Sequence, residues 1–292
     1  MFKILNKQIL APNIKRVDVY APMIARKMKT GQFVSLCPQE GDERIPLSVI
    51  ESDPARGTLT FIFQEIGFTT AKLGAIPINE SIFSILGPLG IQSQISKLGT
   101  VVFVTTGIGT AQVLPICRAL KNAGNKVIGI IGAKTKKEII LEAQMRLSCY
   151  QLFIATNDGS YERKAQATDF LKTFLNQQKV DLVYAVGSVE MMKTVSQMTK
   201  EKNIPTRVIL NPMMVDCMGM CGSCRVKIGG EIVLACLDGP EFDGHKVDFE
   251  DFQIRMNAYK ELEIWDNQEL LAKPKLSESK ILTRFLSGIL KK

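Results

Sequence analysis

Short hydrophobic runs separated by glycine, proline and aspartate recur through residues 1–97. The runs mix apolar and polar positions and return at intervals of about ten residues, which is typical of short antiparallel strands. The N-terminal residues also fit a first strand. The later strand-like runs are residues 14–20, 32–36, 47–50, 58–63 and 80–86. This pattern predicts an antiparallel β-barrel over residues 1–97.

Residues 98–210 follow a different pattern, in which hydrophobic runs of strand length alternate with stretches of helical length. The strand-like runs are residues 101–105, 126–131, 151–155, 182–186 and 206–210, and the helical stretches are residues 110–122, 136–147, 166–177 and 189–202. Nearly continuous hydrophobic strands are buried on both faces of a sheet. We therefore expect an α/β domain with a five-stranded parallel sheet, helices on both faces and right-handed crossovers.

The rest of the chain divides into a cysteine-rich module, residues 211–250, and a helical basic tail, residues 251–292. A helix is expected over residues 251–264, and residues 281–290 place Ile, Leu and Phe side chains on one helical face. Such a tail fits packing on its own domain or docking to a partner protein, and fits an anionic membrane less well. The whole chain of 292 residues is therefore expected to be multidomain.

The charge distribution narrows the candidate partners. The formal net charge is +8, but residues 271–292 carry six basic residues against Glu278 alone, so the remainder is only mildly basic. No basic stripe with interleaved aromatic residues appears, which argues against nucleic-acid binding. No uninterrupted apolar run approaches the roughly 18 residues of a membrane span. With no secretion signal and seven cysteines, an odd number, the chain is expected to be cytoplasmic.

Closely spaced cysteines after residue 210 give the most specific chemical signal. Asp216, Cys221, Cys224 and Cys236 have the spacing D-x4-C-x2-C-x11-C. This is the spacing of a plant-type 2Fe–2S loop with an aspartate in the place of the first thiolate. Glycines within the loop allow the tight turns that converging ligands need, and a strand–turn–strand pattern then brings the fourth ligand. We therefore expect these four residues to hold a 2Fe–2S cluster.

Other uses of the cysteines stay open at this point. Cys221 and Cys224 alone are half of a zinc site, although a lone Cys236 and a single histidine fit zinc poorly. Disulfides are disfavoured in a reducing compartment. Cys217 is the softer and better iron ligand, whereas Asp216 has the better spacing. The remaining cysteines are expected to be buried bystanders in apolar surroundings, namely Cys37, Cys117 and Cys149.

Glycines and small polar residues follow the strands of the α/β domain, where open parallel sheets bind their ligands. Gly107 and Gly109 come after the first strand and, with Thr110, open a helix whose N-terminal N–H groups attract phosphate. Three lysines between residues 134 and 137 suit either a 2′-phosphate contact or a solvated helix start. Later strand ends supply further candidates for binding NAD(P)H, namely Asn157, Asp158, Gly159, Gly187 and Met191.

A nicotinamide nucleotide delivers two electrons at once and a 2Fe–2S centre accepts one, so a flavin is expected between them. The β-barrel should then hold FAD. Arg44 offers a cation for the pyrophosphate, and Ser48 offers a hydroxyl near the isoalloxazine. The further candidates are Pro46 and Leu47 in the same strand and Gly67, Thr69 and Thr70 in a turn. A strand with an adjoining turn accounts for the same residues without any ligand.

The order of barrel, nucleotide sheet and 2Fe–2S module, together with these motifs, resembles the ferredoxin–NADP reductase superfamily. Within it, residues 1–250 resemble the electron-transfer subunit of dihydroorotate dehydrogenase. The chain is more closely similar to the small subunit of NADH-dependent reduced ferredoxin:NADP oxidoreductase, a family also described as sulfide dehydrogenase subunits. The motifs that carry this resemblance are RIPLS at residues 44–48, TNDGSY at residues 156–161 and VDCMGMCGSCR at residues 215–225.

The resemblance implies an oxidoreductase subunit with FAD in the barrel, NAD(P)H on the sheet and a 2Fe–2S cluster that includes Asp216 among its ligands. It implies that the nicotinamide reaches the flavin near Arg44, Ser48 and Thr70, and that no side chain acts as a catalytic acid or base. It also implies a heterodimer with a large flavin/iron–sulfur subunit, with ferredoxin as a further candidate partner.

The chain departs from the family pattern at four positions around the nucleotide site. Thr106 stands in place of an expected glycine and Gln112 in place of an expected proline. Asn157 replaces an aspartate and Ala165 replaces a glycine. These departures keep a second hypothesis open, a non-catalytic docking and relay subunit that does not itself oxidise NAD(P)H. The choice between NADH and NADPH and the final electron acceptor also stay open.

Overall fold

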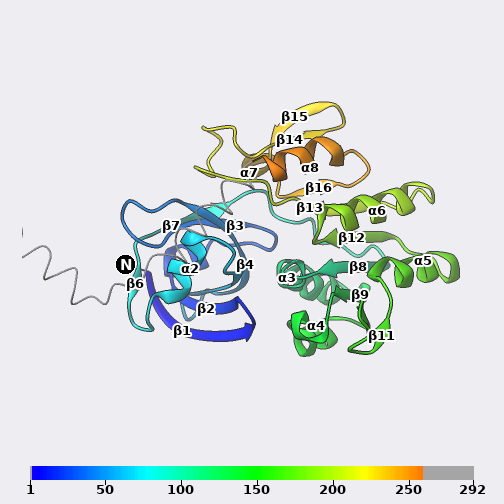
Figure 1. Ribbon diagram of the computed structural model, residues 1–292, viewed down its shortest axis with the longest axis horizontal. Coiled ribbons are helices and arrows are strands. Elements are labelled where there is room, and N and C mark those ends of the chain that lie inside the picture. The colour runs from blue at the N-terminus through cyan, green and yellow to red at the C-terminus, as the bar shows by residue number, and fades with distance from the viewer. Residues whose placement is uncertain (1, 259–292) are drawn as a thin grey trace, which may run out of the picture. The chain divides into compact units, whose positions relative to one another are not determined.

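The computed structural model describes residues 2–258, and its residues up to Met256 form one compact unit (Figure 1). The first part is a sheet of antiparallel pairs in the order β6-β1-β2-β5-β4-β3-β7. Its strands are β1 (Phe2–Ala11), β2 (Ile14–Tyr20), β3 (Phe33–Cys37), β4 (Ile45–Asp53), β5 (Thr58–Gln64), β6 (Ser81–Ile82) and β7 (Ser84–Leu89). Two short helices, α1 (Pro22–Ala25) and α2 (Phe68–Ala75), interrupt the strand sequence.

This sheet curls into a nearly closed barrel. Strands β6 and β7 occupy opposite edges of the sheet, yet only Phe83 separates them in the chain. The two edges must therefore come close together. Side chains such as Val17, Val19, Leu59 and Phe61 alternate along their strands and are fully buried inside the barrel. The predicted β-barrel is confirmed.

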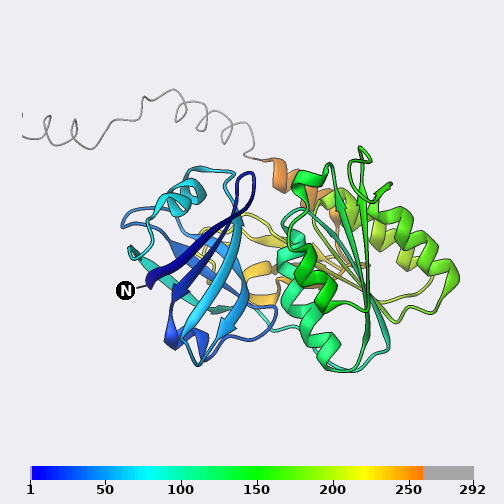
Figure 2. The ribbon, with the colours of Figure 1, turned by 90° about the horizontal axis from the view of Figure 1, so that it is seen from below.

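The second part is a mostly parallel sheet in the order β11-β10-β9-β8-β12-β13-β16, with helices on both faces (Figure 2). Its parallel strands are β8 (Thr100–Thr106), β9 (Lys126–Ala133), β10 (Gln151–Thr156), β11 (Arg163–Lys164), β12 (Leu182–Val186) and β13 (Thr206–Ile209). The connecting helices are α3 (Gly109–Asn122), η1 (Lys136–Glu138), α4 (Glu142–Ser148), α5 (Ala167–Gln177) and α6 (Val189–Lys200).

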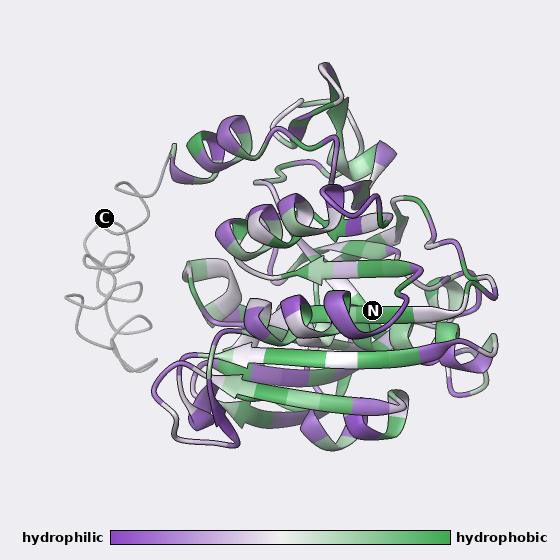
Figure 3. Ribbon diagram, turned by 90° about the vertical axis from the view of Figure 1, so that its right-hand side faces the viewer, coloured by the Kyte–Doolittle hydropathy of each residue, from purple (hydrophilic) through white to green (hydrophobic). Residues whose placement is uncertain are grey.

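Alternate residues of each central strand pack into different cores. On β8, Val101 and Phe103 join the cluster with α3 and α4, whereas Val102 and Val104 join the cluster with α5 and α6. Both faces are therefore apolar, which explains the hydrophobic runs in the sequence. Mainly hydrophobic strands are visible in Figure 3. The five predicted strands and the two-faced helical cover are confirmed.

Two details of this domain differ from the sequence expectation. The helix expected over residues 136–147 is divided, because Leu141 has a left-handed backbone with φ 58° between η1 and α4. The sheet also gains β11 and an antiparallel edge strand, β16 (Glu241–Asp243), beyond the five strands expected. Both added strands are only two or three residues long, too short to give a hydrophobic pattern.

The cluster loop and its hairpin lie between β13 and β16, so this part of the cysteine-rich module is tied to the nucleotide sheet at both ends. It contains a hairpin of β14 (Arg225–Ile228) and β15 (Glu231–Leu234), followed by α7 (Ala235–Asp238). Gly229 and Gly230 have φ values of 62° and 92°, as a tight hairpin turn requires. After β16 the chain forms α8 (Phe249–Asn257).

The expected basic tail falls largely outside the described residues. The helix expected over residues 251–264 corresponds to α8 as far as the structure describes it. Residues 259–292, including the apolar helical face expected at residues 281–290, lie outside the described part. Within residues 2–258, no helix is both long and apolar enough to cross a membrane.

Candidate nucleotide, flavin and cluster sites

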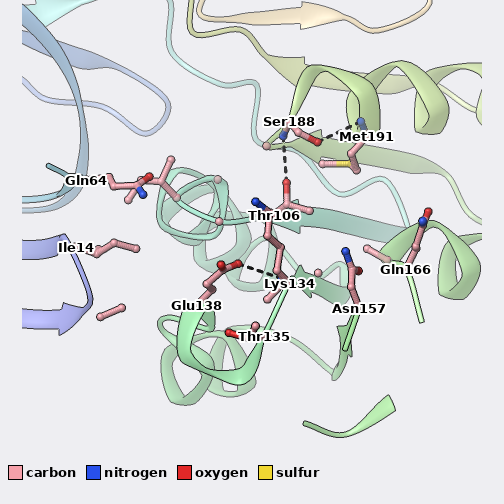
Figure 4. Close-up of a pocket in the computed structure, with 18 of the residues that line it drawn as sticks. Ile14, Gln64, Thr106, Lys134, Thr135, Glu138, Asn157, Gln166, Ser188 and Met191 are labelled. Carbon is pink, nitrogen blue, oxygen red and sulfur yellow. Dashed lines mark hydrogen bonds between the residues drawn. The ribbon is translucent and has the colours of Figure 1, made fainter. Parts of the chain in front are cut away.

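A cavity of about 960 Å³ opens at the carboxyl ends of the parallel strands (Figure 4). Its walls include Thr106 at the end of β8, the segment from Gly107 to Gly109 that follows, Lys134 after β9, Asn157 after β10 and Gly187 after β12. Ile14 and Gln64 of the barrel form its opposite side. A cavity of this size at this edge of an open α/β sheet suits an extended nucleotide.

The glycine loop brings the backbone close to neighbouring segments. A Cβ atom at Gly109 would overlap the carbonyl of Val186, and one at Gly187 would overlap the hydroxyl of Thr106. The Thr106 hydroxyl accepts a hydrogen bond from the Ser188 N–H at 3.1 Å. The family pattern has glycine at position 106. The Thr106 side chain fits here because Gly187, which lies opposite it, has no side chain.

The start of α6 adds a second helix N-terminus to the cavity. Ser188 caps the helix, because its hydroxyl accepts the Met191 N–H at 3.3 Å. The N-termini of α3 and α6 thus both begin beside this cavity. Such N-termini favour the phosphate oxygens of a nucleotide.

The predicted nucleotide residues divide into two groups. Gly107, Gly109, Asn157, Gly187 and Met191 all line the cavity. Three others do not. They are Thr110, Asp158 and Gly159. The buried Thr110 hydroxyl is hydrogen-bonded to the Thr105 hydroxyl at 3.0 Å. Asp158 and Gly159 form a turn in which the Asp158 carboxylate accepts the Ser160 N–H at 2.9 Å. The Ser160 hydrogen bonds also hold the pKa of Asp158 below its usual range.

Other lining residues had no signal in the sequence. They are Ile14 and Gln64 from the barrel, Gln166 and Thr168 near α5, and Asn211 after β13. Of the three lysines after β9, Lys134 and Lys137 line the cavity, whereas the Lys136 ammonium lies 4.7 Å from the centre of the Tyr161 ring. The Glu138 carboxylate is also in this wall, where it accepts the Lys134 N–H at 3.1 Å.

The predicted flavin residues lie on the barrel, and one of them has an unused donor. Arg44 precedes β4 and donates from Nη2 to the Ser84 hydroxyl at 3.0 Å. Its Nη1 atom is buried and has no hydrogen-bond partner among the described residues. A buried cationic donor without an acceptor is costly, so a pyrophosphate oxygen of FAD fits this position.

The turn before α2 has both an open face and an internal cap. A Cβ at Gly67 would meet nothing within 4 Å, so a ligand has room to approach the backbone there. The Thr70 hydroxyl accepts the Gly67 N–H at 3.1 Å and donates to the Gly67 carbonyl at 2.9 Å. Thr69 is buried. Thr70 therefore shapes the turn, and the Gly67 backbone is the part of the turn with open space beside it.

Ser48 connects the flavin strand to the nucleotide domain. Pro46, Leu47 and Ser48 lie on β4 and pair with β3. The Ser48 hydroxyl accepts a hydrogen bond from the Gln112 amide of α3 at 3.4 Å. The candidate flavin strand is thus in contact with the helix that begins at the glycine loop.

The four predicted cluster ligands form two pairs. Asp216 and Cys221 are neighbours, because Asp216 Oδ2 accepts the Cys221 N–H at 2.8 Å, and burial together with the nearby Cys224 thiol raises the pKa of Cys236. Within the described part of the chain, no group of three or more His, Cys, Asp or Glu side chains is arranged to hold a metal ion. A 2Fe–2S cluster has two terminal ligands on each of its irons, so two pairs are the donor set that it needs.

The loop around these pairs is organised by Asp216. Its Oδ1 atom accepts the Met218 N–H at 3.0 Å, and its Oδ2 atom accepts the N–H groups of Met220 and Cys221, both at 2.8 Å. These hydrogen bonds lower the pKa of Asp216, so the carboxylate is ionised. An ionised carboxylate is also the form that binds a metal.

The thiols differ in their surroundings. Cys224 and Cys236 are each 1% exposed, and burial raises the pKa of Cys236 to about 12. The exposed Cys221 thiol has its pKa lowered by the Ser223 hydroxyl, 3.1 Å away. Cys217 is buried beside Ser35 of β3, and burial raises its pKa. Its thiol therefore lies against the barrel and also within electrostatic range of Asp216, Cys221 and Cys224.

The comparisons with known proteins agree with this geometry. Residues 211–248 match the iron–sulfur cluster binding domain of dihydroorotate dehydrogenase B. The chain is 36% identical to a dihydroorotate dehydrogenase B electron transfer subunit homolog of Thermotoga maritima, over 89% of this chain and 92% of that protein. It is 32% identical to the corresponding electron transfer subunit of Desulforamulus reducens, over 85% of this chain and 97% of that protein.

A solved structure of a related oxidoreductase has the same fold. One chain of the NADH-dependent reduced ferredoxin–NADP oxidoreductase structure superimposes with a TM-score of 0.88 and 35% identity, over 93% of this chain and 98% of that chain. Barrel, nucleotide sheet and iron–sulfur module together define a reductase of the ferredoxin–NADP reductase type. The chain belongs to the family of electron-transfer subunits of dihydroorotate dehydrogenase B. It is an oxidoreductase subunit that transfers electrons between NAD(P)H, FAD and a 2Fe–2S cluster.

Proposed function

We propose that the chain binds NAD(P)H in the 960 Å³ cavity and exchanges electrons, through FAD on the barrel and the cluster loop, with a larger flavin/iron–sulfur subunit. The observation that carries the proposal is the contact of Ser48 with Gln112, because it brings the flavin strand to the edge of the nucleotide cavity. Hydride transfer requires such proximity between the two ligands.

Each part of the chain has a separate task. The N-termini of α3 and α6 bind the pyrophosphate of the nucleotide, and Arg44 binds that of FAD through its unused Nη1 donor. FAD supplies the change from two-electron to one-electron transfer. The barrel strands and the nucleotide loops position the two ligands, and no acid or base is required from a side chain.

For the cluster we propose Asp216, Cys221, Cys224 and Cys236 as ligands, with Cys217 excluded. An ionised carboxylate has about four acceptor positions, and the loop N–H groups use three of them, which leaves one for an iron atom. The Cys217 thiol is buried beside Ser35 of the barrel, and it also interacts electrostatically with Asp216, Cys221 and Cys224. The two pairs supply the four donors without it.

The partner is inferred from the relatives. The relatives are electron transfer subunits of dihydroorotate dehydrogenase B, and the solved neighbour comes from an NADH-dependent reduced ferredoxin–NADP oxidoreductase. We therefore propose a heterodimer with a larger catalytic subunit, and ferredoxin as a further redox partner of the assembled complex.

An anaerobic absorbance spectrum of the purified chain tests the proposal, with iron and flavin quantified and one equivalent of NADH or NADPH then added. We expect about two irons and one FAD per chain, and bleaching of both chromophores by one of the two nucleotides. Cofactors that are present but inert to both nucleotides would instead support a relay subunit that does not oxidise NAD(P)H. Zinc in place of iron, without flavin, would refute the proposal.

A further inference from the structure

Two side-chain amides form a reciprocal pair at one end of the nucleotide cavity. The Gln112 Nε2 atom donates to Asn211 Oδ1 at 3.1 Å, and the Asn211 Nδ2 atom donates to Gln112 Oε1 at 3.3 Å. Both residues line the cavity. Gln112 lies in the first turn of α3, and Asn211 follows β13, so residues 99 positions apart meet here.

The amide pair lies next to the flavin strand. Gln112 Nε2 also contacts the Ser48 hydroxyl at 3.4 Å. The charged residues that line the cavity are Lys134, Lys137 and Glu138 after β9 and Glu190 on α6. The amide pair and the Ser48 hydroxyl that it contacts are all neutral groups.

A reciprocal amide pair shows which ligand group would fit there. Each amide presents one donor and one acceptor side by side, and its partner satisfies both. A primary carboxamide on a ligand offers the same arrangement of one N–H donor beside one carbonyl acceptor. It can therefore replace either partner without leaving a polar group unsatisfied. Gln112 is half-buried and Asn211 is exposed, so separating the pair costs little.

We propose that Gln112 and Asn211 recognise the carboxamide of the nicotinamide and thereby place the nicotinamide ring beside the flavin strand. The proposal rests on the function proposed above, and it deepens that function by naming the residues that orient the reacting end of the nucleotide. The proline expected at position 112 has no side-chain amide, so this recognition belongs to the present chain and not to the general motif. We regard both as positioning residues.

Binding of oxidised dinucleotides to the FAD-loaded chain tests the proposal, because binding can be measured without turnover. The probes are NAD⁺ or NADP⁺, the analogue in which 3-acetylpyridine replaces nicotinamide, and ADP-ribose or its 2′-phosphate. The acetyl group keeps the carbonyl acceptor and lacks the N–H donor, whereas ADP-ribose lacks the whole ring. Dissociation constants come from isothermal titration calorimetry.

We expect the unmodified chain to bind the nicotinamide form about three- to tenfold more tightly than the acetylpyridine form, the range for one net hydrogen bond. Gln112→Leu and Asn211→Leu should each reduce this ratio towards one. The affinity for ADP-ribose should remain unchanged in both variants. Gln166→Leu is the matched control, since it removes an amide from another wall of the same cavity and should leave the ratio intact.

Three outcomes would overturn the inference. An unchanged ratio in both variants would show that the amides do not contact the carboxamide. A parallel loss of ADP-ribose affinity would assign them to the adenosine end, and a loss of FAD would assign them to the flavin. The proposed function fails separately, if the unmodified chain binds no dinucleotide and its flavin is reduced by neither NADH nor NADPH.

Discussion

The cluster loop and the nucleotide cavity position their binding groups in different ways. In the loop, the positioning is local, because Asp216 accepts three backbone N–H groups within five residues, and one hairpin then brings Cys236 to Cys224. In the cavity, the positioning comes from the fold, since the lining residues extend from Ala11 to Asn211 and meet only when the sheet and barrel are complete. The cluster site is therefore formed by one short segment of the chain, whereas the nucleotide site is formed by residues from distant segments.

This difference separates the consequences of mutation. A change in the loop should remove the cluster and leave the cavity intact, because no residue of the loop lines the cavity. A change in the glycine loop should weaken nucleotide binding and leave the iron content unaltered. The four predictions below test this independence, beginning with the largest effect.

The largest effect is expected for Cys236→Ala, which removes one thiol of the buried pair with Cys224. The iron content should fall from about two per chain to nearly none, because a cluster with three ligands is labile. Iron analysis and the visible spectrum measure this loss, and the affinity for ADP-ribose should stay the same. Cys117→Ala is the control, since that thiol is equally buried in the α3 core, at 0% exposure. Equal loss of iron in both variants would contradict the assignment.

The next effect distinguishes Asp216 from Cys217. We expect Cys217→Ala to retain about two irons with an unaltered electron paramagnetic resonance spectrum, because that thiol contacts Ser35. Asp216→Cys should also retain iron, but with a changed spectrum, since a soft thiolate then replaces a hard carboxylate at the iron. The opposite result, iron loss in Cys217→Ala and an unchanged spectrum in Asp216→Cys, would make Cys217 the ligand.

The same contrast explains how much of the molecule was predictable. The cluster motif and its hairpin lie within one short stretch, so spacing alone identified Cys221, Cys224 and Cys236 as candidates, and the family match supports that module. The longer strands of both sheets were found from hydrophobic patterns, because each central strand packs on a core along most of its length, whereas the short strands β11 and β16 were missed. Asn211 and Gln64 gave no signal, because their place in the cavity depends on segments far apart in the chain.

Local backbone geometry limited the prediction in a second way. Leu141 is an ordinary helix former, and nothing in its neighbours marks the left-handed conformation that precedes α4. Thr110 follows the glycine loop in sequence, yet its hydroxyl turns inward to Thr105. A motif therefore located the loop but did not determine which of its side chains face the cavity.

A smaller effect is expected for Gly109→Ala in the nucleotide cavity. The added Cβ would overlap the Val186 carbonyl, and backbone on both sides must shift to relieve the overlap. Dinucleotide affinity should fall about tenfold or more, equivalent to at least about 1.4 kcal/mol. Calorimetric titration with ADP-ribose measures the change. Iron content should remain at the unmodified level, and a simultaneous loss of iron would show that the two sites are not independent.

The smallest effect concerns the residue that joins the two regions. Glu241 of β16 follows the last cluster ligand, Cys236, by five residues, and its carboxylate accepts hydrogen bonds from the Tyr184 hydroxyl at 3.1 Å and the Ser93 hydroxyl at 2.8 Å. Burial and the Glu241 carboxylate raise the pKa of Tyr184, so Tyr184 keeps its proton and remains a donor. Glu241→Gln weakens these charge-assisted bonds and should lower the free energy of unfolding by about 1 kcal/mol.

Chemical denaturation under anaerobic conditions measures this loss, and Glu250→Gln is the matched control. The Glu250 side chain is 82% exposed and pairs with Lys193 at 3.4 Å, so its loss should cost less than about 0.5 kcal/mol. The Glu241 side chain is only 14% exposed. If Glu241→Gln leaves stability unchanged but alters both iron content and dinucleotide affinity, then Glu241 couples the loop to the cavity. The cluster loop and the nucleotide cavity would then not be independent of each other.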